Sequence, residues 1–221
     1  MRIDILTLLP EMFTPLTESI IGRAVKSGKV EIVVTDIRDY TENKHRKCDD
    51  YPFGGGAGMV MTPQPIYSAI MAVDPNHEAR RIFMSPKGRT FCQPMVKELL
   101  SYDRILLLCG HYEGVDQRVL DLCIDEEISL GDFVLTGGEI PAMAITDSLC
   151  RYIGGVISDE SLSEESFTGN LLEYPQYTRP QEYKGIPVPE ILRSGDHGKI
   201  DKWRREQAIG LTKKRRPDLF K

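Results

Sequence analysis

Short apolar runs alternate along this chain with amphipathic segments. Residues that run apolar or alternate apolar and polar are typical of strands and occupy 3–9, 30–37, 81–84, 105–109 and, with a break, 127–135. Apolar residues that recur every three or four positions predict helices over 10–27, 63–73, 94–102, 115–123 and 140–153. Since short continuous apolar strands are typical of parallel sheets covered on both faces, this alternation predicts an α/β domain with a mainly parallel sheet.

The pattern changes near residue 155. Residues 154–169 (GGVISDESLSEESFTG) are rich in Gly, Ser and Glu and have few apolar anchors, which predicts a linker or mobile loop. A proline-punctuated stretch, 170–190, follows, and then a helix is predicted over 198–214 around Trp203. We therefore expect a domain boundary inside 155–170.

Charge is unevenly distributed in the chain. Its 221 residues carry a net charge of −5, but residues 199–221 hold nine Lys or Arg against three acids, a net +6, which leaves −11 for residues 1–198. A basic segment on an acidic body fits an arm that contacts phosphates. It fits equally well the solvated end of a helix, where cations are favoured by the helix dipole.

Several sequence features bear on the compartment. No apolar run approaches the roughly 20 residues that a membrane span needs, and the first residues lack the pattern of a secretory signal. The five cysteines are scattered and never spaced CxxC, which argues against a disulfide framework and a zinc site. The four histidines show no metal-ligand spacing either. We expect a cytoplasmic protein with reduced thiols, without a membrane partner or a protein-bound metal.

Three candidate loops follow strands. Ser85 and Pro86 follow the strand 81–84, GHYEG (110–114) follows 105–109, and LGDFVLTGGEIP (130–141) begins inside the broken strand. Ligands bind at the carboxyl ends of strands in open α/β sheets. The glycines allow a flat ligand to approach the main chain, and the apolar residues offer walls that suit an adenine-like ring. Ordinary turn glycines would explain each loop alone, but three converging loops favour a ligand site.

Other segments carry candidate chemistry. The glycine run 54–58 matches neither GxGxxG nor a phosphate-binding loop with its lysine, so it is a weak nucleotide motif. Glu164 and Glu165 lie in the predicted linker, and Arg151 lies near the end of the preceding helix. A loop carboxylate can act as a general base and an arginine can stabilise developing negative charge, although solvated loop charges are the simpler explanation. An α/β phosphoryl-transfer enzyme and a non-catalytic RNA-binding protein remain alternatives.

Long motifs in order along the chain resemble one family. They are DIRDYTENKHRKCDDYPFGGGAGMVM (36–61), FMSPKGR (83–89), LLLCGHYEGVDQR (106–118), ISLGDFVLTGGEIPAM (128–143), LLEYPQYTRP (171–180), KWRREQ (202–207) and KKRRPDL (213–219). Together they resemble the bacterial tRNA (guanine-37-N1)-methyltransferases of the SPOUT class.

This resemblance implies an architecture and a reaction. It implies a catalytic SPOUT domain over 1–157 with a trefoil knot in its C-terminal part, a flexible linker over 158–169 and a small helical tRNA-binding domain over 170–221. It also implies a homodimer with active sites at the subunit interface. The reaction transfers a methyl group from S-adenosylmethionine to N1 of guanosine 37 of tRNA, supported by a divalent metal, usually Mg²⁺.

The same resemblance implies site residues. The cofactor would be held by residues of the three strand-end loops: Phe83, Met84, Ser85, Pro86, Gly110, Tyr112, Glu113, Leu130, Gly131, Asp132, Phe133, Val134, Leu135, Gly137, Gly138 and Pro141. Glu165 would be the base, Arg151 would stabilise charge at guanine O6, and Glu113 would belong to the active site.

This sequence departs from the family at two places. Glu165 stands where the family has an aspartate before Ser-Phe, with Asp159 and Glu164 as alternatives, and His111 stands where other members carry arginine. Glutamate has the same chemistry with one more methylene, which a flexible linker can absorb.

Overall fold

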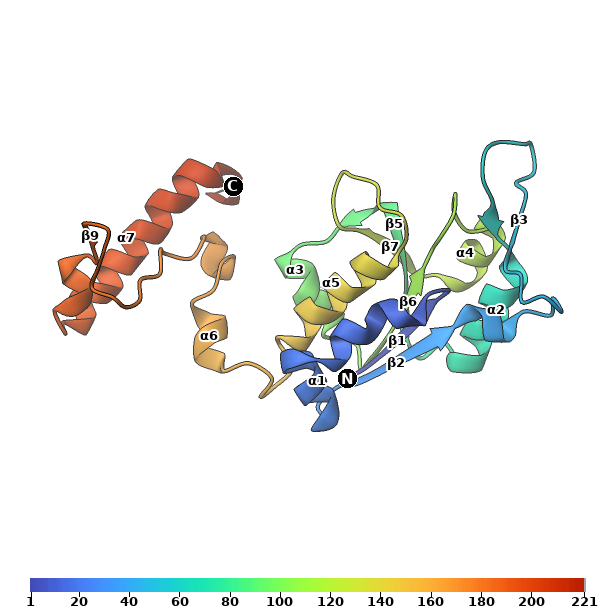
Figure 1. Cartoon of the computed structure of the whole chain (residues 1–221), viewed down its shortest axis with the longest axis horizontal. Helices are drawn as coiled ribbons and strands as arrows, with labels where there is room; N and C mark the ends of the chain where they lie inside the picture. Colours follow the sequence, from blue (N-terminus) through green and yellow to red (C-terminus); the bar gives the residue numbers. More distant parts are fainter. Residues whose placement is uncertain (221) are drawn as a thin grey trace. The chain divides into compact units, whose positions relative to one another are not determined.

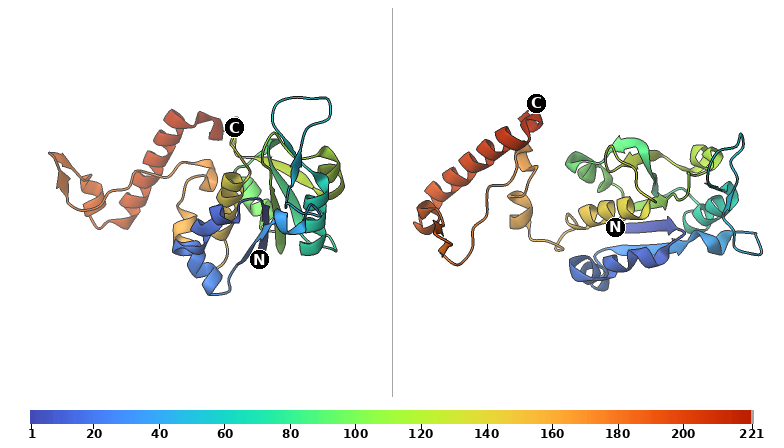
Figure 2. Two further views of the ribbon diagram at one scale, coloured as in Figure 1. Left: turned by 45° about the vertical axis from the view of Figure 1, so that its right-hand side comes forward. Right: turned by 45° about the horizontal axis from the view of Figure 1, so that its top comes forward.

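A computed structural model describes residues 1–220, without the side chain of Asp159. The chain forms two compact units, Met1–Ile157 and Ser158–Lys221, which are described separately. Figures 1 and 2 show the ribbon of both.

A five-stranded sheet lies at the centre of the first unit. Its strand order is β2-β1-β6-β5-β7, and every neighbouring pair is parallel. The strands are β1 (Arg2–Thr7), β2 (Glu31–Asp36), β5 (Arg80–Thr90), β6 (Arg104–Cys109) and β7 (Glu126–Ser129). The predicted α/β fold with a parallel sheet is therefore confirmed.

Helices cover both faces of the sheet (Figures 1 and 2). Ile105 and Leu107 of β6 pack into one core cluster with η1 (Pro10–Thr17), α1 (Ser19–Lys26), α3 (Gln93–Leu99) and α5 (Glu139–Cys150). Leu106 and Leu108 pack into the opposite cluster with η2 (Ile37–Tyr40), α2 (Pro63–Val73) and α4 (Gln117–Cys123). Because successive side chains of a strand point to opposite faces, a continuous apolar strand serves both layers.

The predicted helix over 10–27 is wrong as a single element. The structure has the 3-10 helix η1 and then α1, separated by Glu18, and Ser19, the first residue of α1, has a φ of 56°. Pro15 lies inside η1 and has no N–H for a continuous helical ladder. The turn is tight, because a Cβ on Gly22 would lie 1.9 Å from the carbonyl oxygen of Thr17.

Two strands near the candidate site also differ from the prediction. β7 ends at Ser129, because the Ser129 hydroxyl hydrogen-bonds to both the amide and the carbonyl of Gly131 and turns the chain out of the sheet. β5 continues beyond the predicted 81–84 to Thr90, with a break in its register against β7 between Met84 and Arg89. Segment 85–88 therefore bulges where sequence alone indicated only the end of a strand.

The second unit is small and mainly helical. It contains α6 (Asp159–Ser163), η3 (Thr168–Asn170), β8 (Glu182–Tyr183), β9 (Ile186–Pro187), η4 (Glu190–Arg193), α7 (His197–Arg215) and η5 (Pro217–Phe220). The predicted helix over 198–214 is confirmed as α7, which Asp196 caps by accepting from the Lys199 amide. Within the predicted linker, the structure has the short helix α6, capped by the Ser158 hydroxyl.

Candidate active site

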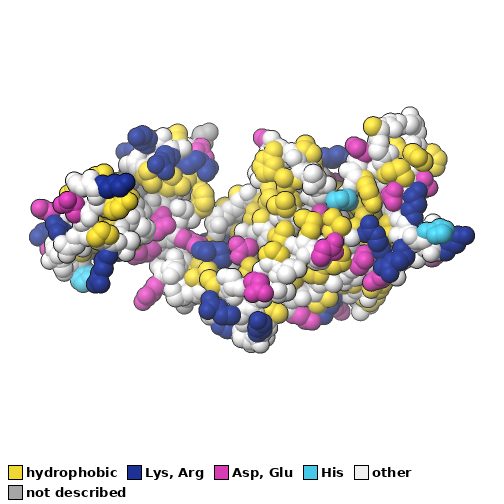
Figure 3. Space-filling model, viewed as in Figure 1, with side chains coloured by type: hydrophobic (Ala, Val, Ile, Leu, Met, Phe, Trp, Pro, Cys, Tyr) yellow, Lys and Arg dark blue, Asp and Glu magenta, His cyan; other side chains and the backbone are white. Residues whose placement is uncertain are grey.

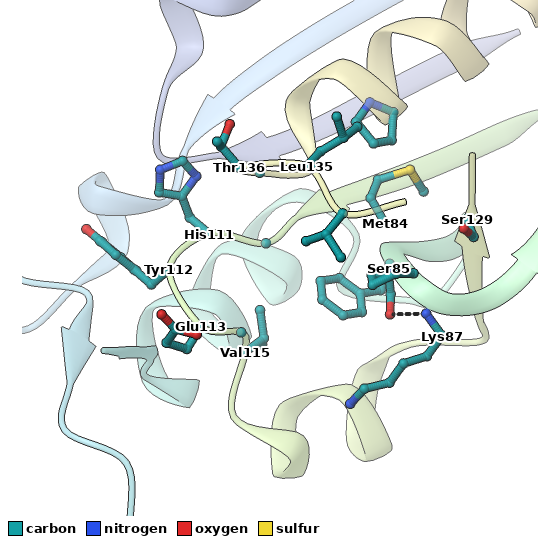
Figure 4. A pocket seen from close by; sticks show the side chains of 18 of the residues that line it. Met84, Ser85, Lys87, His111, Tyr112, Glu113, Val115, Ser129, Leu135 and Thr136 are labelled. Carbon is teal, nitrogen blue, oxygen red and sulfur yellow. Dashed lines mark hydrogen bonds between the residues drawn. The ribbon is translucent and has the colours of Figure 1, made fainter. Parts of the chain in front are cut away.

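Three loops at the carboxyl edge of the sheet enclose a cavity of about 290 Å³. The first is the bulge 85–88 within β5, and the other two follow β6 and β7; these three strands are neighbours in the sheet, so segments far apart in the sequence meet at one edge. Figure 4 shows Leu135 and Thr136 on one side of the cavity and Glu113 and Val115 on the other. The cavity lies where α/β sheets bind ligands.

A close crossing of two of these loops forms one wall. The amide of Gly138 donates to the carbonyl of Gly110 at 2.9 Å. A Cβ on Gly138 would lie 2.7 Å from the Cα of Cys109, and one on Gly110 would lie 2.8 Å from the Phe83 ring. Because backbone and a packed ring cannot move aside as the end of a flexible side chain can, both positions require glycine.

The bulge in β5 is constrained in the same way. A Cβ on Gly88 would lie 2.2 Å from the carbonyl carbon of Glu127 in β7. Ser85 is buried, and its hydroxyl accepts from the Lys87 amide at 3.2 Å, the dashed line in Figure 4. These contacts hold segment 85–88 against β7 and so fix the second wall of the cavity.

Most of the predicted cofactor residues line this cavity. They are Phe83, Met84, Ser85, Pro86, Gly110, Tyr112, Glu113, Leu130, Phe133, Val134, Leu135, Gly137, Gly138 and Pro141. Gly131 and Asp132 are not among the lining residues. Gly131 instead makes the turn out of β7, at a φ of 156°.

Further lining residues were not among the predicted cofactor residues, although His111, Gly114 and Thr136 lie within the predicted loops. The further lining residues are Val60, Lys87, His111, Gly114, Val115, Gln117, Leu120, Ile128, Ser129 and Thr136. Most of them lie next to predicted residues in the same loops, so extending each motif by a residue or two would have found them. Val60 comes from β4 (Val60–Met61), and no local pattern links that strand to the cavity.

A buried carboxylate lies behind the crossing. Glu139 is the first residue of α5 and only 2% exposed, and it accepts a hydrogen bond from the Thr7 hydroxyl at 2.8 Å. Its other oxygen lies 3.8 Å from Nδ1 of His111, a buried atom without a hydrogen-bond partner among the described residues. Burial and the Glu139 charge together hold the pKa of the nearby Cys109 thiol well above its usual value. Sequence analysis did not single out Glu139.

The end of the glycine run 54–58 reaches the rim of the cavity. Met59 accepts from the Glu113 amide at 2.9 Å, and the Met61 amide donates to Gly114 at 2.9 Å. A Cβ on Gly58 would lie 2.5 Å from the Glu113 side chain. Gly58, the last residue of this run, and the following Met59 and Met61 therefore support the Glu113 loop.

The candidate base lies in the second unit, which has its own cavity. Glu165 is half-buried and, with Glu164, lines this cavity of about 430 Å³. Glu164 accepts from the Tyr174 hydroxyl at 2.5 Å and lies 3.7 Å from Arg204. Burial and this bond raise the pKa of Tyr174. Arg151 follows α5 in the first unit.

Two residues named in the sequence analysis cannot be assessed in the structure. The alternative base Asp159 and the last cation of the basic segment, Lys221, lie outside the described residues and side chains. Across the described part of the chain, no three His, Cys, Asp or Glu side chains gather as metal ligands. No described helix is long and apolar enough to cross a membrane.

The fold and cavity define an α/β protein with a ligand-sized pocket at the carboxyl ends of parallel strands. Comparison with known proteins narrows this class. A family model described as tRNA (guanine-1)-methyltransferase TrmD matches residues 1–221. The chain belongs to this family.

Similar proteins cover the whole chain. A tRNA (guanine-N(1)-)-methyltransferase of Clostridioides difficile is 54% identical over 226 residues, which cover 100% of this chain and 98% of the relative. Proteins of the same name from Clostridium acetobutylicum and Clostridium novyi are 57% and 56% identical to this chain, respectively. Both alignments cover 100% of this chain, and they cover 91% and 92% of the respective relative. Membership of a methyltransferase family implies S-adenosylmethionine as the donor.

We predict that Gly138→Ala weakens binding of S-adenosylmethionine about tenfold or more, because overpacking costs about 1–3 kcal/mol and falls here on the cavity wall. Isothermal titration calorimetry measures the affinity, and circular dichroism checks the fold. The control is Gly154→Ala, since no heavy atom lies within 4 Å of a Cβ at that position. Unchanged affinity in the Gly138 variant would contradict the assigned wall.

Proposed function

We propose that this chain transfers a methyl group from S-adenosylmethionine to the N1 atom of guanosine 37 in tRNA. The supporting observation is the glycine crossing beside the 290 Å³ cavity, together with membership of the tRNA (guanine-1)-methyltransferase family over residues 1–221. The family supports the reaction at guanine N1. Position 37 and the residue roles belong to the proposal.

The cavity fits the proposed donor. Its walls combine apolar side chains such as Leu135 and Val115 with exposed backbone at Gly110 and Gly137. Apolar surface suits an adenine ring, and glycine backbone gives close hydrogen-bonding groups for its edge. The bound donor would supply an electrophilic methyl group on a sulfonium. The contribution of the chain is to hold it in position and to exclude water.

Guanine N1 carries a proton at neutral pH and is then a poor nucleophile. A base must take this proton as the methyl group moves, and a cation must stabilise the negative charge that shifts to O6. We assign the base to Glu165 and the cation to Arg151. Glu164, whose carboxylate contacts Tyr174 and Arg204 within the second unit, is the alternative base. Glu113, exposed at the cavity rim, would contact the guanine side of the site.

The assembly is part of this proposal. Phe133, Val134 and Ile140 are 55%, 84% and 47% exposed beside the cavity. Such neighbouring apolar side chains favour burial against a partner, so they support a homodimer with the site at its interface. We further propose that segment 130–138, which crosses the 110–111 loop, belongs to a trefoil knot, and that the enzyme acts in the cytoplasm.

Mg²⁺ enters no step of the proposal. The described side chains offer no group of three His, Cys, Asp or Glu to hold it.

We predict that Glu165→Gln lowers the single-turnover rate about 10²–10⁴-fold, the usual contribution of a general base. The assay uses an unmodified tRNA transcript, and mass spectrometry after nuclease digestion locates the methyl group at guanine 37 in the wild type. Glu165→Asp should keep substantial activity because it retains the carboxylate, and Glu164→Gln should keep most of the rate.

Two outcomes would contradict these assignments. If Glu165→Gln kept the full single-turnover rate and Glu164→Gln lost it, the general base would be Glu164 and not Glu165. A wild-type enzyme that methylates another tRNA position would refute the proposed site of reaction.

The basic end of α7 is the proposed phosphate contact. Lys213, Lys214, Arg215 and Arg216 are all exposed, although Arg216 also pairs with Asp218 at 2.7 Å. We predict that changing all four to Ala weakens tRNA binding and flattens its salt dependence, because fewer counterions are released. S-adenosylmethionine affinity should stay constant. Arg23 and Lys26, exposed cations in the last turn of α1, form the control pair. An unaltered salt slope would identify the cluster as a solvated helix end.

A further inference from the structure

Two aromatic side chains project from the segment between β3 (Asp49–Asp50) and β4. In this segment, residues 51–58, which we call the aromatic loop, Tyr51 is 78% exposed and Phe53 is 99% exposed. Both are large apolar groups left in water. A ring that packs against nothing contributes little to folding, so its exposure calls for another explanation.

The backbone of the aromatic loop keeps these rings clear of the body. Gly54, Gly55 and Gly56 have φ values of 87°, 79° and 127°, which L side chains rarely adopt. A Cβ on Gly54 or Gly55 would meet no heavy atom within 4 Å. The glycines therefore shape a projecting turn without covering the neighbouring aromatic faces.

The base of the aromatic loop is tied to the catalytic pocket. β3 and β4 pair through Asp49–Met61 and Asp50–Val60, and the Asp116 amide donates to Met61 at 3.0 Å. The Glu113 amide also donates to Met59, and the Met61 amide donates to Gly114. Together these hydrogen bonds hold both ends of the aromatic loop at the rim of the cavity. A group bound by the tip is therefore positioned relative to the pocket.

Basic side chains precede the tip. Lys44, His45, Arg46 and Lys47 are exposed, and Figure 3 shows basic and histidine side chains below the hydrophobic tip on this side. Arg46 is paired with Asp39 and Asp36, and Lys47 lies 3.9 Å from Asp50. Lys44 has no acid within ion-pair distance among the described residues, which leaves an exposed cation in the segment that precedes the aromatic loop.

Exposed aromatic rings, flanking glycines and a basic segment favour a nucleic-acid base, rather than a protein surface, as the binding partner of the loop. A stable protein interface buries about 1,200–2,000 Å², whereas two aromatic side chains flanked by glycine and charge bury roughly 150–250 Å² each. An unstacked RNA base needs only one ring face, with a nearby cation for its phosphate.

We infer that the aromatic loop is an RNA contact in which Phe53 stacks on an unstacked base of the tRNA substrate, while the exposed basic segment 44–47 offers cations to the RNA phosphates. The inference rests on the proposed function. It adds a recognition surface in the first unit, separate from the basic end of α7.

The test compares Phe53→Ala with the wild type in the full chain. Fluorescence anisotropy measures binding of an unmodified tRNA transcript and of its anticodon stem-loop, with the loop free or closed by a complementary strand. We expect Phe53→Ala to bind the open stem-loop about tenfold or more weakly, as removal of a stacking ring usually does. The closed form should show little difference. Phe53→Tyr should restore most of the affinity, and calorimetry with S-adenosylmethionine should be unchanged.

Leu122→Ala is the matched control, since Leu122 is a 75% exposed apolar residue on α4 that does not line the cavity. Equal affinity of Phe53→Ala and wild type for the open stem-loop, in an enzyme that methylates tRNA, would overturn the inference and leave the proposed function standing. A wild type that neither binds nor methylates tRNA would overturn both. A change of sedimentation mass in Phe53→Ala without a loss of RNA affinity would assign the loop to contacts between copies.

Discussion

The site of this enzyme depends on the close passage of Gly138 against Cys109 and Gly110. The Gly138 amide bonds to the Gly110 carbonyl at 2.9 Å, and the two backbones leave no room for a Cβ. This contact brings the loop after β7 against the loop after β6, and α5 begins at the next residue. The cavity, the buried Glu139 and the position of His111 all follow from it.

In the proposed reaction, the chemistry is divided between two parts of the chain. The first unit offers a shaped cavity whose walls are mostly apolar side chains and glycine backbone, which suits positioning. The second unit offers Glu165 and the basic end of α7. Methyl transfer from a sulfonium requires mainly that the protein orient the reactants and remove one proton, and the proposal assigns these two tasks to the first and second unit, respectively.

Sequence periodicity predicted correctly the helices whose ends are determined by residues adjacent in the sequence. α2 begins at Pro63 and α7 follows the capping Asp196, and both match the prediction closely. Periodicity failed where contacts between distant residues decide the backbone. The break at Ser19 accompanies the tight approach of Gly22 to Thr17, and the bulge at 85–88 depends on its passage past Glu127.

In the site, too, features determined by neighbouring residues were predicted, and features determined by distant residues were not. Gly, Ser and Pro residues after strands indicated the three loops, and close approach of the backbones demands the glycines. Glu139 was missed because its burial depends on Thr7, 132 residues earlier in the chain. Gly131 was assigned to the cofactor although its conformation is explained by the turn that it makes with Ser129. The motifs thus located the pocket, but only the three-dimensional contacts separate lining residues from supporting ones.

Hydrogen exchange with and without S-adenosylmethionine tests the central assignment of the pocket most directly. We predict slower exchange in residues 83–88, 110–115 and 130–138 when the donor is added, because these loops enclose the cavity of the first unit. Exchange around the second unit's cavity, in residues 163–174, should stay the same. Protection confined to 163–174, or binding by calorimetry without protection of the three loops, would contradict the account.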